Sequence, residues 1–174
     1  MWKKIYQVKL TPQYAIMKFT YLKQPPKRYT FEQPKLKEWI ESIVRGKVLN
    51  LFAGKTKLNC NEVRNDLDKT MLADYNLDAY EFIKKWKGEK FDTIILDPPY
   101  SLRKGMRKYN GKYMSSFKRI KDIVPLILKD NGLVITFGYH SVSMGKSRGF
   151  KQKEICLISH AGAHHDTIVI VEQK

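Results

Sequence analysis

The sequence predicts an α/β fold in which a mostly parallel sheet is covered by helices on both faces. Short, almost wholly apolar runs alternate along the chain with amphipathic stretches, and turn residues follow many of the runs. Strands that are apolar on both faces are typical of parallel sheets buried between helices. With 174 residues, 43% of them hydrophobic, the chain is long enough for such a core. We expect one domain over 1–174, with 1–33 as an N-terminal extension.

The chain before Gly46 is predicted to contain an N-terminal pair of elements and one helix. Apolar-rich runs at 5–10 and 14–22 indicate a strand pair, or a strand and a short helix. From Pro34 onward, apolar side chains recur at the spacing of one helical face, at Leu36, Trp39, Ile40 and Ile43. A proline in the first turn is compatible with this helix, and Gly46 ends it.

Strands and helices then alternate to the last residues. We expect strands at 47–52, 60–65, 74–77, 91–96, 133–137, 154–159 and 167–171. Helices are expected at 79–87 and 115–129, and Asn131-Gly132 would stop the second of them. The last two strands form a hairpin-like pair, which is an unusual addition to a parallel sheet.

The charge balance indicates a polyanionic partner. Thirty-three Lys and Arg residues stand against 17 Asp and Glu, a formal net charge of +16. Such an excess on a folded domain attracts nucleic acid, although a lysine-rich genome composition could inflate it. No apolar run is long enough to span a membrane, so we expect no membrane partner. Two cysteines do not form a disulfide framework, and we expect a cytoplasmic protein.

The tetrad Asp97-Pro98-Pro99-Tyr100 directly follows the apolar run 91–96. Two prolines lack amide donors, so the strand cannot continue past Asp97. The turn therefore presents a carboxylate, a rigid carbonyl and an aromatic ring at a strand's carboxyl end, where open α/β sheets bind ligands. Asp97 and the Pro98 carbonyl could accept the two hydrogens of an exocyclic amino group while Tyr100 stacks on the base. An isolated Pro-Pro pair would more simply be a strand-ending turn.

Earlier strand ends carry residues that suit a nucleotide-like cofactor. The run 48–52 leads into Ala53-Gly54, a small-residue turn of the kind that approaches a cofactor closely, often beside a helix N-terminus. Asp66 follows the second strand, where a carboxylate can hold ribose hydroxyls. Asp78 ends the third, where it could accept from an adenine amino group. Each acid alone is more simply a cap or turn residue, but their order before the tetrad predicts a site.

With these motifs the chain resembles the S-adenosylmethionine-dependent amino-methyltransferases of nucleic acids, over roughly residues 34–174. The resemblance implies the seven-stranded, Rossmann-like class I methyltransferase sheet, mostly parallel with an antiparallel last strand. It implies S-adenosylmethionine as the cofactor and the Asp-Pro-Pro-Tyr (DPPY) tetrad as the catalytic residues, Asp97, Pro98, Pro99 and Tyr100. The cofactor-binding residues that it implies are Asn50, Phe52, Ala53, Gly54, Asp66, Asp78 and Ala79. Phe31 would complete the pocket.

Two positions depart from the family's pattern. The family usually has an acid where this chain has Asn50, and a second glycine close to Lys55 or Thr56. Asn50 can accept a hydrogen bond, but it brings no charge to the cofactor's ammonium group. Lys55 adds positive charge near the sulfonium. These features favour an alternative of a different class, a catalytically degenerate nucleic-acid-binding module.

Basic and aromatic residues follow the tetrad. Their mixture suits a lid that grips a phosphate backbone and stacks on bases, although a solvated basic loop would have the same composition. The expected nucleic-acid-binding residues are Arg103, Lys104, Arg107, Lys108, Lys112 and, on the same side of the sheet, Lys146 and Arg148. The spacing of His160, His164, His165 and Asp166 fits no standard zinc pattern, so we expect no metal.

The expected activity is methyl transfer to the exocyclic amino group of a nucleic-acid base, above all the 6-amino group of adenine in DNA. By resemblance, small enzymes that methylate the 2-amino group of guanine in RNA share the tetrad. The short segment between the tetrad and the strand at 133–137 leaves no room for a target-recognition domain. This compactness indicates either RNA as the substrate or a DNA enzyme with little intrinsic sequence selectivity. The alternative is an RNA methyltransferase that acts on guanine or adenine in rRNA or tRNA. The oligomeric state is not predicted.

Overall fold

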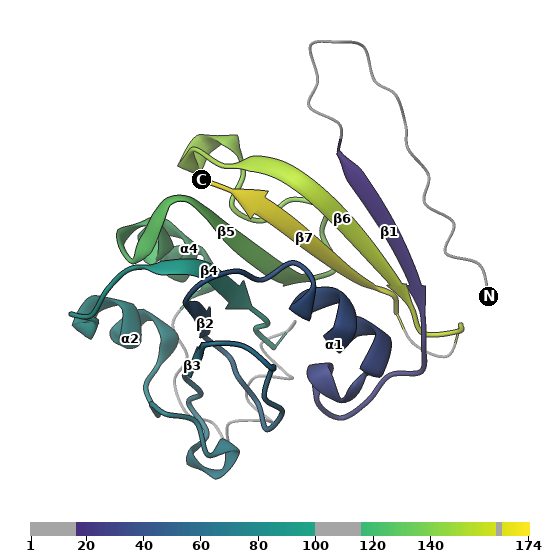
Figure 1. Ribbon diagram of the computed structural model, residues 1–174, viewed down its shortest axis with the longest axis horizontal. Coiled ribbons are helices and arrows are strands. Elements are labelled where there is room, and N and C mark those ends of the chain that lie inside the picture. Colours follow the sequence, from purple (N-terminus) through teal and green to yellow (C-terminus); the bar gives the residue numbers. More distant parts are fainter. Residues whose placement is uncertain (1–16, 100–115, 163–164) are drawn as a thin grey trace.

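The computed structural model describes residues 17–99, 116–162 and 165–174, and seven strands in these ranges form one sheet. Their order is β1-β6-β7-β5-β4-β2-β3 (Figure 1). All neighbouring strands pair in parallel except β7, which runs antiparallel to both β5 and β6. The predicted fold class is thereby confirmed. The strands are β1 (Lys18–Lys23), β2 (Val48–Asn50), β3 (Glu62–Arg64), β4 (Phe91–Leu96), β5 (Leu128–Gly138), β6 (Lys151–Ser159) and β7 (Thr167–Gln173).

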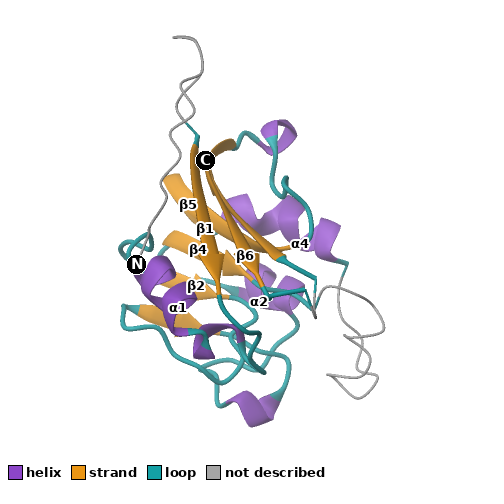
Figure 2. Ribbon diagram, turned by 90° about the vertical axis from the view of Figure 1, so that its right-hand side faces the viewer, coloured by secondary structure: helices purple, strands orange, loops and turns teal. Residues whose placement is uncertain are grey.

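Helices cover both faces of the sheet. Helix α1 (Pro34–Glu41) lies on one face, and α2 (Ala79–Lys85) and α4 (Phe117–Ile123) lie on the other (Figure 2). In the ranges that the structure describes, four single 3-10 turns accompany these helices, namely η1 (Thr30–Glu32), η2 (Lys69–Met71), η3 (Val124–Leu126) and η4 (Lys146–Arg148). Within the described ranges, none of the helices has the length and apolarity needed to cross a lipid bilayer.

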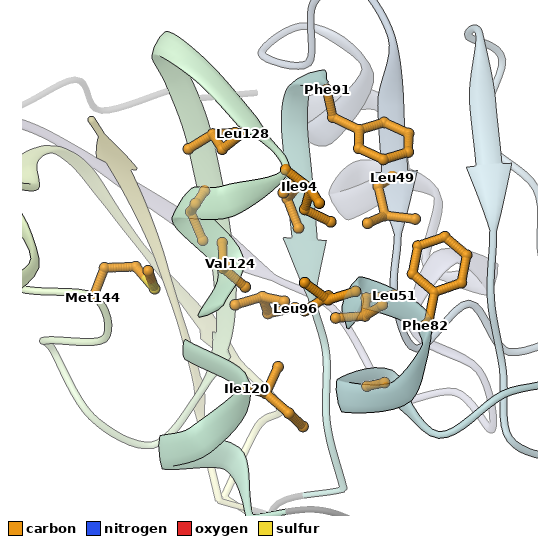
Figure 3. Close-up of a cluster of buried hydrophobic side chains, with 14 of the residues drawn as sticks. Leu49, Leu51, Phe82, Phe91, Ile94, Leu96, Ile120, Val124, Leu128 and Met144 are labelled. Atoms are coloured by element: carbon orange, nitrogen blue, oxygen red, sulfur yellow. The ribbon is translucent and has the colours of Figure 1, made fainter. Parts of the chain in front are cut away.

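Strand β4 links the two hydrophobic cores because its residues alternate between the faces of the sheet. Ile94 and Leu96 point toward α2 and α4 and join the cluster drawn in Figure 3. Ile95, between them, belongs to the cluster that α1 covers. All three side chains are fully buried. This double burial explains why the sequence of the strand is continuously apolar instead of alternating.

Several predicted elements are confirmed, some with shifted bounds. The strand at 91–96 matches β4 residue for residue, and α1 begins at Pro34 as predicted. The helix predicted over 115–129 is shorter, because α4 ends at Ile123 and the chain continues in η3. Pro125 lies in that turn, and a proline both lacks the amide donor of an α-helix and clashes with the preceding turn. β5 then begins at Leu128.

The strand predicted over 74–77 is wrong, because only an isolated parallel bridge joins Asn65 to Tyr75 there. The Asn65 side chain instead binds the backbone of Leu77 twice, donating to its oxygen (3.0 Å) and accepting from its nitrogen (3.1 Å). A side chain thus replaces the strand ladder. The seventh strand is β1, which lies in the range expected as an extension and pairs with β6 at the sheet edge.

The connection from β2 to β3 departs from the usual parallel crossover. Residues 51–61, all of which the structure describes, contain no helix, whereas parallel strands are usually joined through one. Carboxylates hold the loop instead: Glu41 accepts from the Asn59 amide (2.8 Å) and Glu62 from the Leu58 amide (3.2 Å). No helix therefore begins in the connection that follows the Gly54 turn.

Phe82 should contribute strongly to stability. It is 2% exposed, its ring stacks on Trp86, and Tyr75 meets it edge-on with ring centroids 5.2 Å apart. We expect Phe82→Ala to lower the free energy of unfolding by about 3–5 kcal/mol, because it leaves a cavity in the core. Denaturant titration followed by circular dichroism measures this. Leu126→Ala, at a side chain that is 64% exposed, should change it by less than about 0.5 kcal/mol. Equal losses would contradict the prediction.

Candidate active site

Asn50 and Asp97, the predicted site residues at the ends of β2 and β4, lie side by side. Asn50 ends β2, where it pairs with Ile95 of β4, and the Leu51 amide donates to the Ile95 carbonyl (3.1 Å). Asp97 follows two residues later. Because side chains alternate along a strand, Asn50 and Asp97 both point to the face that α1 covers. The parallel pairing thus brings the polar residue of β2 and the acid of the tetrad to one edge of the sheet.

Asp97 receives a hydrogen bond from a distant part of the chain. The Thr30 hydroxyl in η1 donates to Asp97 Oδ2, across 67 positions of sequence. Asp97 itself is half-buried, Pro98 is buried and Pro99 is half-buried. Tyr100 lies outside the described residues. Sequence reasoning missed Thr30, since no motif or spacing links it to the tetrad.

The turn after β2 is built as a tight backbone loop. Gly54 adopts a φ of +57°, which favours glycine, and a Cβ there would lie 3.3 Å from Cδ1 of Tyr29. The Ala53 amide donates to the Asn65 carbonyl (3.0 Å). Phe52 points into the core, where its ring meets Phe117 edge-on with centroids 6.5 Å apart. Phe52 therefore anchors the turn in the core, and Ala53 ties it to the residue that follows β3.

Asp66 holds this turn. It is 1% exposed, and its two carboxylate oxygens accept from the amides of Gly54 and Asp68, each at 2.9 Å. Hydrogen bonds from backbone amides to a carboxylate are stronger than neutral ones, so Asp66 ties β3 firmly to the Gly54 turn. A contact between Asp66 and a ribose remains a prediction.

Asp78 and Ala79 begin α2. Asp78 is its N-cap, and Oδ1 accepts from the amides of Tyr80 (3.0 Å) and Glu81 (3.4 Å). This is the helix-cap role that such an acid usually has. Ala79, the first residue of α2, is buried in the core. Contacts of either residue with an adenine ring remain predictions.

A buried carboxylate, Glu62, lies beside Asn50. The Asn50 Nδ2 atom donates to Glu62 Oε1 (3.0 Å), and burial of the side chain raises the pKa of Glu62. Asn50 Oδ1 is buried and has no hydrogen-bond partner among the residues that the structure describes. Buried acceptors without a donor are costly, so this atom suits a donor group on a ligand. Sequence reasoning missed Glu62, although a charged residue inside the strand predicted over 60–65 was a signal.

Arg64 partly balances this carboxylate. Its Nε atom lies 3.8 Å from Glu62 Oε2, at the outer limit of an ion pair. Its two terminal nitrogens donate to the carbonyls of Gly54 (2.6 Å) and Leu72 (3.2 Å). The guanidinium group is therefore committed mainly to the backbone around the Gly54 turn.

The predicted nucleic-acid-binding residues divide into two groups. Lys146 and Arg148 lie in η4. This turn lies near the C-terminus and away from the carboxyl end of β4 (Figure 1). Arg148 pairs with Asp122 of α4 (2.6 Å), and Glu172 near the end of β7 accepts from the Met144 amide (2.7 Å). The expectation that they share the side of Asp97 is wrong. β6 runs in the same direction as β4, and η4 directly precedes β6, so η4 lies at the amino edge of the sheet, where these strands begin. Arg103, Lys104, Arg107, Lys108 and Lys112 lie outside the described residues.

His160 has a structural environment. Its Nδ1 atom lies 3.1 Å from the Gln24 carbonyl and its Nε2 atom 3.1 Å from the Thr167 hydroxyl. Both ring nitrogens are thus engaged within the fold. In the described part of the chain, no three His, Cys, Asp or Glu side chains are grouped as a metal ion would require.

Solved structures with a similar fold include proteins that are described as methyltransferases. No protein-family model matches the sequence, and no curated protein matches it significantly. TrmN from Thermus thermophilus is 17% identical, with a TM-score of 0.58 over 82% of this chain and 49% of TrmN. SMU.776, described as a methyltransferase and solved with SAH, is 15% identical, with a TM-score of 0.60 over 84% of this chain and 50% of its own. YhhF from Escherichia coli, also described as a methyltransferase, is 15% identical, with a TM-score of 0.54 over 97% and 98%.

This chain therefore spans about half the length of TrmN and of SMU.776, and nearly all of yhhF. At these identities the likeness concerns the fold. The chain has the seven-stranded, Rossmann-like fold of these methyltransferases.

Proposed function

We propose that this protein is an S-adenosylmethionine-dependent methyltransferase that acts on the exocyclic amino group of a nucleic-acid base. The observation that carries the proposal is the parallel pairing of β2 with β4, which places Asn50 and Asp97 at adjoining carboxyl ends of a methyltransferase-like sheet. Open α/β sheets bind ligands outside the carboxyl ends of their strands. SMU.776, which has a similar fold, was solved with SAH, the demethylated product of this cofactor.

The residues at the end of β2 fit the cofactor's amino-acid group. Asn50 Oδ1 is a buried acceptor that lacks a partner among the described residues, and Glu62 adds a carboxylate 3.0 Å from the Asn50 amide nitrogen. An ammonium group supplies both the donors and the charge that this pair needs. Glu62 thus compensates for the acid that Asn50 does not provide. The Gly54 turn, with Phe52, Ala53, Asp66, Asp78 and Ala79, would enclose the rest of the cofactor.

The chain's own contribution to the reaction centres on Asp97. When bound, S-adenosylmethionine would supply a methyl group on a sulfonium: the new C–N bond would replace the C–S bond, whose electron pair would stay on sulfur, and the nitrogen would lose one proton to solvent. Asp97 and the Pro98 carbonyl accept the two amino hydrogens and favour the pyramidal nitrogen. Positive charge grows on that nitrogen, so a fixed carboxylate stabilises the transition state more than the ground state. Tyr100 would stack on a base flipped out of its helix.

The net charge of +16 supports a nucleic acid as the substrate. Adenine in DNA is the first candidate because of the complete tetrad. RNA is the second, since the described residues between β4 and β5 add only α4 and η3 and no recognition domain. Unmethylated plasmid DNA and transcribed ribosomal RNA, each incubated with labelled cofactor and digested to nucleosides, would separate the two. A binding module without turnover would label neither.

Asp97→Ala should abolish methyl transfer, with a fall in turnover of at least about a hundredfold, because it removes the charge aimed at the reacting nitrogen. Cofactor affinity, measured by calorimetry, should survive. Asp130→Ala is the control, since Asp130 has a side chain that is 92% exposed and pairs with Lys174. Substantial turnover by Asp97→Ala would exclude the proposed role.

Glu62→Gln should weaken binding of S-adenosylhomocysteine by about tenfold, because a charged hydrogen-bond partner of its ammonium group is lost. Binding of 5′-methylthioadenosine, which lacks that group, should not change. Wild-type affinity for S-adenosylhomocysteine should also fall as the pH drops through the raised pKa of Glu62, and the variant should lack this dependence.

Glu41→Gln is the matched control for this experiment. Glu41 holds the same loop through the Asn59 amide (2.8 Å) but does not contact Asn50. If Glu41→Gln and Glu62→Gln weakened both ligands equally, Glu62 would act only by bracing the loop.

A further inference from the structure

Three consecutive residues, Tyr29, Thr30 and Phe31, contact the carboxyl ends of three adjacent strands. Tyr29 lies against the Gly54 turn that follows β2. The Thr30 hydroxyl donates to Asp97, which follows β4. The Phe31 ring meets Phe137 of β5 edge-on, with centroids 5.9 Å apart. We call residues 29–31 the strap, because they cross the edge of the sheet where β2, β4 and β5 end.

The strap is held at both ends. The Tyr29 amide donates to the Glu32 side chain (3.2 Å), and the Glu32 amide donates back to the Tyr29 carbonyl (3.1 Å). Phe31 is buried in the core that α1 covers, and Pro34 starts α1 directly after the strap. A threonine side chain also has few rotamers because it branches at Cβ. The Thr30 hydroxyl therefore meets Asp97 from a backbone that is fixed on both sides.

We propose that Thr30 is a positioning residue for methyl transfer, which holds the Asp97 carboxylate in the orientation that accepts an amino hydrogen of the target base. The inference rests on the proposed function and adds a residue that no motif assigned. A carboxylate can rotate about its last bond, and a hydrogen bond from a fixed donor restricts that rotation. Orientation matters here, since a small displacement of a catalytic group can lower the rate severely.

The chain contains a matched control for this contact. Thr20 of β1 donates to the carboxylate of Glu154 in β6 (2.6 Å), and Thr20, like Thr30, is half-buried. The two hydrogen bonds join the same pair of chemical groups. In the sheet, however, β1 is separated from β4 by β6, β7 and β5, so the Thr20 contact is remote from Asp97.

The test compares Thr30→Val, Thr30→Ser and Thr20→Val in methyl transfer to the plasmid DNA and ribosomal RNA named above. Thr30→Val should lower kcat about tenfold, which is the order of one hydrogen bond to a charged group. The KM for S-adenosylmethionine and the calorimetric affinity for S-adenosylhomocysteine should stay within about twofold. Thr30→Ser keeps the hydroxyl and should retain kcat. Thr20→Val should retain kcat even if its unfolding temperature falls as much as that of Thr30→Val.

Three outcomes would overturn the inference while leaving the proposed function in place. These are an unchanged kcat in Thr30→Val, a kcat in Thr30→Ser as low as in Thr30→Val, and equal losses of kcat in Thr30→Val and Thr20→Val. A wild-type protein that transfers no methyl group to either polymer would instead overturn the proposed function, and this inference with it.

Discussion

The parallel pairing of β2 with β4 is the constraint on which the candidate site depends. It aligns Asn50 with Ile95 and so sets Asp97 beside the end of β2, on the same face of the sheet. A shift of one residue would turn Asp97 to the opposite face, because side chains alternate along a strand. The apolar residues on both faces of β4 oppose such a shift, since each fits its own core. The packing of the core thus determines the geometry of the site.

Carboxylates take the place of a helix in the segment that follows β2. Asp66 holds the Gly54 amide, and Glu62 and Glu41 hold the amides of Leu58 and Asn59. A helix would satisfy these donors through its own backbone, whereas here each one needs a side chain from elsewhere. The arrangement leaves a buried acid next to Asn50, and desolvation of that acid raises the pKa of Glu62. The Glu62 carboxylate, which helps to hold the loop, also makes this region favourable for a cationic group.

The strap lies in the part of the chain that precedes the alternating strands and helices, and it contacts the candidate site. Through Thr30 it reaches Asp97, and through Phe31 it is anchored in the core. The proposed role of Thr30 would couple the local order of the strap to the orientation of Asp97. β1, which precedes the strap, pairs with β6 and extends the sheet at its edge. The N-terminal segment thus contributes to the sheet and to the site.

Local patterns in the sequence were sufficient for α1, β4 and the terminal pair β6 and β7, because burial of one helical face or of both strand faces leaves a periodic signal. They were also sufficient to mark the strand ends at Asn50 and Asp97, since prolines and small residues end strands wherever they occur. Residues 74–77 have a strand-like composition as well, yet the Asn65 side chain takes their backbone bonds. No local pattern records that competition.

Contacts between distant segments were decided by tertiary structure alone. Thr30 meets Asp97, Asn50 meets Glu62, and η4 lies at the amino edge with Arg148 paired to Asp122. Each depends on which strands become neighbours and in which register, and pairing of this kind is a property of the whole sheet. Residue patterns along the chain were enough to predict the fold class and the acid at the end of β4. The side chains that surround that acid follow from contacts between distant segments, which no local pattern specifies.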